Sequence, residues 1–327
     1  MPGSTPSNST MRKALSRLYG SVVSARNLCY ETGVFTVHRT GIPVVSIGNI
    51  EAGGTGKTPM TIALARELSS RGLKPAIVTR GYRGRLKGVV LVRPGHQAGE
   101  VGDEALLMAR VSGVPVIKAP DRVRGALLSR DELFSDLVLL DDGFQHRRIH
   151  RDLDIVLVAG DVHADSLLPL GGLREPAGSL GRADLVVHTK GARSSEMSAE
   201  LVPCSLVGPS GVEEDLSGLR GGHVLAVSGI ARPGHFIEML QDLGARVDAL
   251  AFPDHHGFTR RDMETISTRA QGKDLIVTTE KDLVRLDPSQ LNGAWRALRV
   301  EMCVSGMGRI IREIEDIVRK SGFSRQG

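Results

Sequence analysis

The stretch EAGGTGKTPM, residues 51–60, contains the second half of a phosphate-binding P-loop. In such a loop, glycines let backbone N–H groups curl onto a phosphate, a lysine reaches the outer phosphates, and a hydroxyl binds Mg²⁺. The strict pattern has glycine where Glu51 stands, so the match is to its second half only. The residues predicted to hold the phosphates are Gly53, Gly54, Thr55, Gly56, Lys57 and Thr58, and Thr58 is also predicted to contact the metal.

The surroundings of this stretch favour the P-loop over a glycine-rich turn that happens to hold Lys-Thr. The apolar run PVVSIGN, residues 43–49, precedes it and a helical stretch to about Arg71 follows. Further short β-branched runs then alternate with helical stretches, which predicts an α/β fold with a mostly parallel sheet covered by helices on both faces. These runs are PAIVTR (75–80), PVIKAP (115–120), DLVLLDDG (136–143), DIVLVAG (154–160) and DLVVHTK (184–190).

A second alternation of strands and helices follows a Ser-, Gly- and Glu-rich stretch that ends near residue 222. Its strand-like runs are HVLAVSG (223–229), RVDALAF (246–252) and DLIVTTE (274–280), and an amphipathic helix is predicted near 306–320. The pattern predicts four parts: a disordered tail at 1–10, an amphipathic segment at 11–40, a P-loop core domain at 41–222, and a smaller α/β domain at 223–327.

Composition narrows the classes of partner. The net charge of +5 over 327 residues indicates an anionic partner. Aromatic residues make up only 3% of the chain, so base-stacking platforms for nucleic acid are not expected. Cys29, Cys204 and Cys303 lie far apart, which fits a reducing compartment. The sequence shows neither a run of about 20 apolar residues nor an apolar signal-peptide region, so a cytosolic protein is predicted.

The segment MRKALSRLYGSVVSARNLCY, residues 11–30, is amphipathic. Its apolar residues at helical spacing suit either a membrane interface or packing against the rest of the protein. The pattern alone leaves both alternatives open. The apolar face comprises Leu15, Leu18, Tyr19, Val22 and Val23, and the positive charges around it are Arg12, Lys13, Arg17 and Arg26.

Acidic and basic side chains follow the predicted strands. Asp141 and Asp142 end an apolar run, where one carboxylate would anchor Mg²⁺ and the other orient water or substrate. The pattern does not decide which of them holds the metal. Arg80 follows the run 75–79 and is predicted to contact phosphate, with Arg83 and Arg85 beside it in a basic loop. Asp103 begins a predicted helix. Its position suits either the N-cap of that helix or a catalytic base.

Two stretches contain neighbouring histidines. In FPDHHGF, Asp254 precedes His255 and His256, an arrangement that suits proton transfer or a simple turn. In DDGFQHRRIHRD, His146 and His150 lack further ligands at metal spacing, so zinc is not predicted. The metal that the motifs predict is Mg²⁺, bound together with a nucleotide.

Seven motifs follow one another along the chain: GGTGKTP, TRGYRGR, GDE, LDDGFQHRRIHRDLDIVLV, LLPLGGLREP, FPDHHGF and VTTEKD. Their order is typical of the tetraacyldisaccharide 4′-kinases, the lipid A 4′-kinases of Gram-negative lipopolysaccharide synthesis. The chain resembles this family from about residue 11 to the final helix. One departure is Ala231 in SGIARPG, where glycine is expected.

The resemblance implies transfer of the ATP γ-phosphate to the 4′-hydroxyl of a tetraacyldisaccharide 1-phosphate, with ATP and Mg²⁺ as cofactors. It also implies peripheral association with the cytoplasmic face of the inner membrane, and a second domain that closes over the nucleotide. Asp103 and His255 resemble the family's catalytic pair, with Lys57 and Asp142 also in catalytic roles. Arg80 is expected near the nucleotide and Asp141 and Asp142 near the metal, while His146, Arg174 and Glu175 match the headgroup side of the site.

Two other classes compete with this interpretation. A P-loop switch, either a GTPase or a partitioning-type ATPase, often has a lysine where Ala52 stands, and the guanine motif NKxD is matched only loosely by HTKG at 188–191 and TEKD at 279–282. A nucleic-acid-binding module rests on the positive charge alone. Lipid-dependent phosphate transfer, slow hydrolysis stimulated by a partner, and salt-sensitive DNA retention would distinguish the three.

Overall fold

The computed structural model describes residues 8–189 and 197–322, which fold into two compact units. The first unit comprises Met1–Arg80, Ala119–Glu200 and Val304–Gly327, and the second comprises Gly81–Lys118 and Leu201–Cys303. The bounds of these units do not coincide with the predicted boundary at residue 222, because the chain passes from one unit to the other more than once. The predicted tail at 1–10 lies mostly outside the described residues, and helix α1 begins at Asn8.

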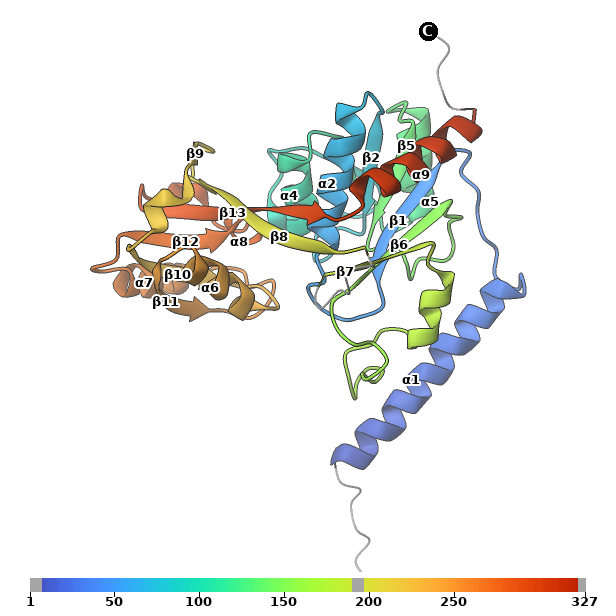
Figure 1. Ribbon diagram of the computed structural model, residues 1–327, viewed down its shortest axis with the longest axis horizontal. Helices are drawn as coiled ribbons and strands as arrows, with labels where there is room; N and C mark the ends of the chain where they lie inside the picture. The colour runs from blue at the N-terminus through green and yellow to red at the C-terminus, as the bar shows by residue number, and fades with distance from the viewer. Residues whose placement is uncertain (1–7, 190–196, 323–327) are drawn as a thin grey trace, which may run out of the picture. The chain divides into compact units, whose positions relative to one another are not determined.

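The first unit is built on parallel strands in the order β2-β5-β1-β6-β7. Every residue of the four strands other than β7 is buried, as expected for strands that are covered on both faces. The bounds are β1 Val44–Asn49, β2 Pro75–Thr79, β5 Leu137–Asp141, β6 Leu153–Val158 and β7 Leu185–His188. The predicted α/β fold class is thereby confirmed (Figure 1).

Helices α2 (Lys57–Ser70), α5 (Arg122–Asp131) and α9 (Met307–Lys320) belong to this unit. Helix α9 buries Ile310, Ile311, Ile314 and Val318, which recur at helical spacing. Sequence order assigns this helix to the C-terminal part of the chain, whereas its apolar face is buried in the first unit. A short 3₁₀ helix, η1, spans Ala177–Arg182.

Helix α1 (Asn8–Glu31) has two different faces (blue in Figure 1). Ser16, Val23 and Asn27 are buried against the first unit. Among the apolar residues of the helix that stay exposed are Leu18 at 63% and Val22 at 61%. The helix therefore packs on its own protein and still presents apolar side chains to solvent. None of the helices in the described part of the chain combines the length and apolarity needed to cross a bilayer.

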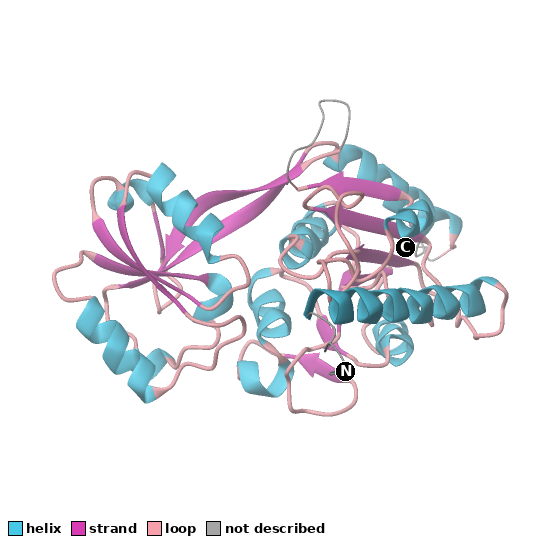
Figure 2. Ribbon diagram, turned by 90° about the horizontal axis from the view of Figure 1, so that it is seen from below, coloured by secondary structure: helices cyan, strands magenta, loops and turns pink. Residues whose placement is uncertain are grey.

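The second unit contains the sheet β11-β10-β12-β13-β8-β9. Alternate residues of β10 enter two different cores: Val224 and Ala226 pack with Phe236, whereas Leu225 and Val227 pack with Ile266. Helices consequently lie on both sides of this sheet (Figure 2). The bounds are β8 Ala199–Val207, β9 Glu213–Glu214, β10 His223–Ser228, β11 Arg246–Ala251, β12 Leu275–Thr279, β13 Trp295–Val304, α6 Pro233–Asp242, α7 Arg260–Arg269, α8 Glu280–Leu283, η2 Leu216–Leu219 and η3 Pro288–Gln290.

The stretch 81–118 also belongs to the second unit. Its strands β3 (Val90–Val92) and β4 (Val116–Lys118) pair antiparallel, and helices α3 (Ala98–Val101) and α4 (Asp103–Val111) lie between them in the chain. The side chain of Lys118 is fully buried, and its ammonium donates to the backbone oxygens of Gly84 and Leu86 at 2.8 and 2.5 Å. This lysine fixes the loop that precedes β3.

A first prediction concerns Gly48, the residue next to the last in β1. A Cβ atom at this position would meet the Cβ of Phe144 and would lie 2.9 Å from its backbone N. Because the strand is buried, we expect Gly48→Ala to lower the free energy of unfolding by about 1–3 kcal/mol. Gly178→Ala is the matched control, since nothing lies within 4 Å of its added Cβ. Equal effects of the two substitutions in denaturant unfolding would contradict this reading of the packing.

Candidate active site

The phosphate-binding loop joins β1 to α2. Gly53 and Gly56 adopt left-handed backbone angles, with φ of 107° and 86°, which glycine adopts without the Cβ strain of other residues. The amide of Asn49 donates to the Thr55 hydroxyl at 2.8 Å and closes the loop on itself. Helix α2 begins at Lys57 without a side-chain cap, and the N–H groups of a helix N-terminus attract anions. The loop thus has the shape and polarity of a phosphate site.

The two predicted aspartates have different surroundings. Asp141, the last residue of β5, is 1% exposed and accepts hydrogen bonds from the hydroxyls of Thr79 and Thr61 at 3.1 and 3.4 Å. Asp142 follows with a φ of 54°, which turns its side chain out of the strand direction, and its side chain is 37% exposed. Asp142 is therefore the more accessible carboxylate beside the loop.

Asp142 lies between two cations of the same unit. Its Oδ1 lies 3.4 Å from the Lys57 ammonium, and Nη1 of Arg174 donates to both of its carboxylate oxygens at 3.2 Å. Burial alone would raise the pKa of Asp142, but the charges of Lys57 and Arg174 hold it below its usual value. With the Thr58 hydroxyl at the start of α2, the two carboxylates supply the hard oxygen donors that Mg²⁺ prefers.

The segment before and at Arg174 runs along the first part of the phosphate-binding loop. The backbone N–H of Arg174 donates to the oxygen of Ile50 at 2.7 Å, and the N–H of Ala52 donates to the oxygen of Gly172 at 2.6 Å. The Tyr19 hydroxyl of α1 donates to the backbone oxygen of Arg174 at 2.9 Å. These three bonds hold the guanidinium of Arg174 beside the loop.

Glu175 is fully buried beneath α1. Its carboxylate accepts from Arg182 at 2.5 Å and from the Asn27 amide at 3.0 Å, and Arg26 lies 3.5 Å away. The family resemblance predicts Glu175 on the headgroup side of the site, and in the structure its carboxylate contacts Arg182 and, on α1, Asn27 and Arg26. No signal in the sequence distinguishes it from Arg174, because burial is a property of the folded chain.

His146 lies in the turn that follows β5, where its backbone N–H donates to the oxygen of Gly143 at 2.8 Å. Among the described residues its Nε2 atom is buried and has no hydrogen-bond partner. Burial and the charge of the buried Arg122 lower the pKa of His146 to about 4. The imidazole is therefore neutral near pH 7. Arg80 is exposed, and it is the last residue of the first of the three chain segments that form this unit.

The state of His146 gives a second prediction. Its pKa is about 6.5 in the unfolded chain and about 4 in the folded one, so only the unfolded state gains this proton as the pH falls through 6.5. His146 therefore makes the protein less stable as the pH falls from 6.5 to 4. An NMR pH titration checks this, with His146→Gln to assign the signal. A His146 signal that titrates near pH 6.5 would refute the prediction.

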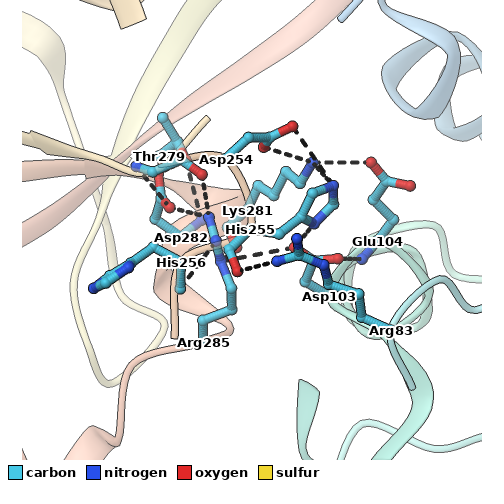
Figure 3. A network of polar contacts seen from close by, with 11 residues as sticks. Arg83, Asp103, Glu104, Asp254, His255, His256, Thr279, Lys281, Asp282 and Arg285 are labelled. Atoms are coloured by element: carbon cyan, nitrogen blue, oxygen red, sulfur yellow. Dashed lines mark hydrogen bonds and ion pairs between the residues drawn. The ribbon is translucent and has the colours of Figure 1, made fainter. Parts of the chain in front are cut away.

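Asp103 and His255 form a pair within the second unit (Figure 3). Asp103 is the first residue of α4 and is 5% exposed, and its Oδ2 lies 2.7 Å from Nδ1 of His255. Oδ1 of Asp103 also accepts the backbone N–H of Glu104 at 2.9 Å, so the carboxylate contacts both the first turn of α4 and the histidine. His255 follows β11 with a φ of 57°, and Nη1 of Arg83 donates to its backbone oxygen at 2.8 Å.

Charged side chains that sequence reasoning did not select surround this pair (Figure 3). The Lys281 ammonium donates to Glu104 at 2.9 Å, and Nε of Arg285 lies 3.7 Å from Asp103 Oδ2. Burial would raise the pKa of Asp103, but the hydrogen bond with His255 and the charge of Lys281 lower it. The motif VTTEKD, which begins in β12, contains Lys281 and is the sequence signal that could have identified this residue.

His256 differs from its neighbour. Its Nε2 lies 3.0 Å from Asp262, and its ring stacks on Phe252 with the ring centroids 4.8 Å apart. Asp262 also accepts the backbone N–H of Thr259 in the capping box of α7. The second histidine of DHH thus supports a helix start, whereas the first contacts Asp103.

A P-loop between a parallel strand and a helix, with a carboxylate pair at the end of the adjacent strand, defines a P-loop nucleotide-binding protein. Residues 9–319 match the profile of the family described as Tetraacyldisaccharide-1-P 4′-kinase. The chain belongs to this family, and the predicted resemblance is confirmed.

Relatives and a solved structure agree with this assignment. The chain is 39% identical over 301 residues to the tetraacyldisaccharide 4′-kinase of Anaeromyxobacter sp. (strain Fw109-5), covering 84% of this chain and 81% of the relative. It is 40% identical over 288 residues to that of Geobacter sulfurreducens, covering 82% of each. LpxK from Aquifex aeolicus in complex with ATP matches with a TM-score of 0.80 and 31% identity, covering 95% of this chain and 99% of that one.

Proposed function

We propose that this chain transfers the γ-phosphate of ATP to the 4′-hydroxyl of a tetraacyldisaccharide 1-phosphate, a step in lipid A synthesis. The observation that carries the proposal is the buried Asp103–His255 pair, with 2.7 Å between Oδ2 and Nδ1, in a chain that also has a P-loop. A nucleotide switch needs no buried base for an acceptor hydroxyl, so the pair favours the kinase. Family membership supports the same choice.

On the nucleotide side, the loop binds the phosphates of ATP through its backbone N–H groups and Lys57. Thr58 and the Asp141–Asp142 pair would hold Mg²⁺, which would supply positive charge next to the phosphates. Of the two aspartates, Asp142 is the one that we assign to direct contact with the metal, because its carboxylate is more exposed than that of Asp141. Arg174 is suited to an anionic group of the substrate, and its contact with Asp142 keeps the guanidinium beside the loop until that group binds.

On the acceptor side, Asp103 acts as the general base. The 4′-oxygen forms a bond to the γ-phosphorus, the bond from that phosphorus to the departing ADP oxygen breaks, and the hydroxyl proton passes to the Asp103 carboxylate. His255 orients the carboxylate through Nδ1. The P-loop and this pair belong to different units, so the reaction requires both units to act on one acceptor hydroxyl. This is the physical basis for proposing that the second domain closes over the nucleotide.

We also propose that α1 brings the protein to the cytoplasmic face of the inner membrane, where an acylated substrate resides. Its exposed apolar side chains suit the acyl boundary, and its basic residues suit anionic headgroups. The exposed apolar residues are Met11, Leu15, Leu18, Val22 and Leu28, and basic residues on the same helix are Arg12, Lys13, Arg17 and Arg26.

The third prediction tests the reaction itself. With ATP labelled at the γ-phosphate, Mg²⁺ and a tetraacyldisaccharide 1-phosphate in detergent, the intact protein is expected to label the lipid. Lys57→Ala is expected to lower this transfer by orders of magnitude, because the outer phosphates lose their cation. Lys87→Ala, at an exposed position, is the control. ATP hydrolysis without labelled lipid would instead support the nucleotide switch.

The fourth prediction concerns the base. Asp103→Asn keeps the shape of the side chain and removes its basicity, so turnover is expected to fall by about 10²–10⁴-fold with ATP binding unchanged. Asp262→Asn is a matched control, because Asp262 also contacts a histidine, His256, in the same unit. Near-normal turnover of Asp103→Asn would remove Asp103 from the role of base.

The fifth prediction concerns α1. Leu18→Asp combined with Val22→Asp is expected to weaken binding to vesicles of anionic lipid in a sedimentation assay, because both side chains are exposed and apolar. Val212→Asp is the matched control, since Val212 is 59% exposed and lies in the second unit. Unchanged sedimentation of the α1 variant would show that this face does not bind lipid.

A further inference from the structure

We propose that Glu51 is a positioning residue for nucleotide binding, whose carboxylate holds the first half of the phosphate-binding loop against the carboxyl end of β6. Glu51 stands where the strict P-loop pattern has glycine. The proposal rests on the proposed function, because it concerns how the loop that binds ATP is held in its working shape. All the residues involved belong to the first unit.

The side chain of Glu51 is buried, although the residue lies at the start of a loop. Glu51 is 9% exposed, and its Oε2 accepts the backbone N–H of Ala159 at 2.7 Å. Strands β1 and β6 pair in parallel, and the last pair in their register is Asn49 with Leu157. Glu51 and Ala159 each lie two residues beyond that pair. The carboxylate therefore continues the contact between the two strands past the end of the ladder.

The backbone around Glu51 is held by a different segment. Residues 50–52 pair with residues 172–174 through an antiparallel bridge between Glu51 and Leu173 and two backbone hydrogen bonds, of 2.6 and 2.7 Å. Ile50 and Leu173 are buried in one core with Val158, the last residue of β6. The backbone thus binds the segment that holds Arg174, and the side chain binds the end of β6. Together these bonds fix the chain as it enters the loop.

A carboxylate in a phosphate-binding loop has the same sign of charge as the phosphates, and like charges repel. The hydrogen bond with Ala159 engages this carboxylate at the end of β6. Glycine at position 51 would lack the bond and would give the entry to the loop more conformational freedom. Because the loop binds phosphate through N–H groups in a fixed arrangement, a looser entry would weaken ATP binding.

The first experiment measures the dissociation constant for ATP by calorimetry, with Mg²⁺ present and without lipid. Glu51→Ala removes the acceptor of the Ala159 N–H, so ATP binding is expected to weaken by about three- to tenfold, the range for one hydrogen bond. Glu51→Gly completes the strict P-loop pattern, and it is expected to weaken ATP binding at least as much. Unchanged or tighter ATP binding by a folded Glu51→Gly would overturn the proposal.

Two further variants separate the reach of the side chain from its charge. Glu51→Gln keeps the length and an oxygen that accepts the Ala159 N–H, so its dissociation constant for ATP is expected to stay within about twofold of the wild-type value. Glu51→Asp keeps the charge but is one methylene shorter, so it is expected to resemble Glu51→Ala. The opposite order would overturn the proposal, because charge would then decide the affinity. If Glu51→Ala does not fold, these two variants carry the comparison.

Asp152→Ala is the matched control. Asp152 directly precedes β6, and its Oδ2 accepts the backbone N–H of Val44, the first residue of β1, at 2.8 Å. The same kind of bond thus joins the same two strands at their amino ends, far along the strands from the loop. Asp152→Ala is expected to lower the free energy of unfolding and to leave ATP affinity unchanged. An equal loss of ATP affinity in this variant would overturn the proposal, because a general weakening of the strand pair would then explain the effect.

The labelled-phosphate assay adds a second measurement. Glu51→Ala is expected to raise the KM for ATP by the same factor and to keep kcat near the wild-type value, because Lys57 and Asp103 are unchanged. A lower kcat with the wild-type KM for ATP would contradict a role in nucleotide positioning. ATP binding that is equal in the wild type and in all Glu51 variants would overturn the role of Glu51 alone. A wild-type protein that binds no ATP would overturn the proposed function as well.

Discussion

The pairing of β1 with β5 determines the geometry of the nucleotide side. In this parallel pair Ile47 lies opposite Asp141, so the chain leaves β1 for the phosphate-binding loop beside the point where β5 ends in its two aspartates. A parallel register brings the carboxyl ends of strands to one edge of a sheet, where ligands bind in open α/β folds. A slip of one residue would turn the buried side chains of both strands to the opposite faces. The core that stabilises the sheet thereby also fixes the distance from Lys57 to Asp142.

The loop is supported from its other side by the segment around Arg174. Its backbone pairs with the residues that follow β1, and its side chains diverge: the guanidinium of Arg174 contacts Asp142, whereas the carboxylate of Glu175 is buried beneath α1. Removing one partner of a buried charge pair leaves the other charge uncompensated. This segment therefore couples the packing of α1 to the electrostatics of the nucleotide site.

Much of this arrangement is predictable from the sequence because it depends on local pattern. The runs that became β1, β5, β6 and β10 are continuous and largely apolar, and motifs that carry the family resemblance follow β1 or overlap β5 and β6. Strands β8 and β13 were missed because exposed and buried residues are mixed along them, including the exposed Cys204 and Cys303. The assignment of α9 to the first unit depends on which surface buries its apolar face, and a sequence pattern does not identify that surface.

The site residues also differ in whether a local sequence pattern or the folded structure determines their surroundings. Lys57 and Asp142 follow strands that meet at one sheet edge, so adjacency in the fold could be inferred. The roles predicted for the remaining site residues stay predictions. The environment of the Asp103–His255 pair depends on Lys281 and Arg285, which reach it from another element of the second unit, and no spacing in the sequence encodes that approach.

Helix α1 also has a consequence for handling this protein. Its buried face supplies Asn27 to the carboxylate of Glu175 and the Tyr19 hydroxyl to the backbone of Arg174, while Leu18 and Val22 face outward. Truncating the helix to make a more soluble variant would expose Glu175 and Arg182 and loosen the segment that holds Arg174. Replacing the outward-facing side chains would keep these bonds. Solubility is therefore better engineered by surface substitution than by shortening the chain.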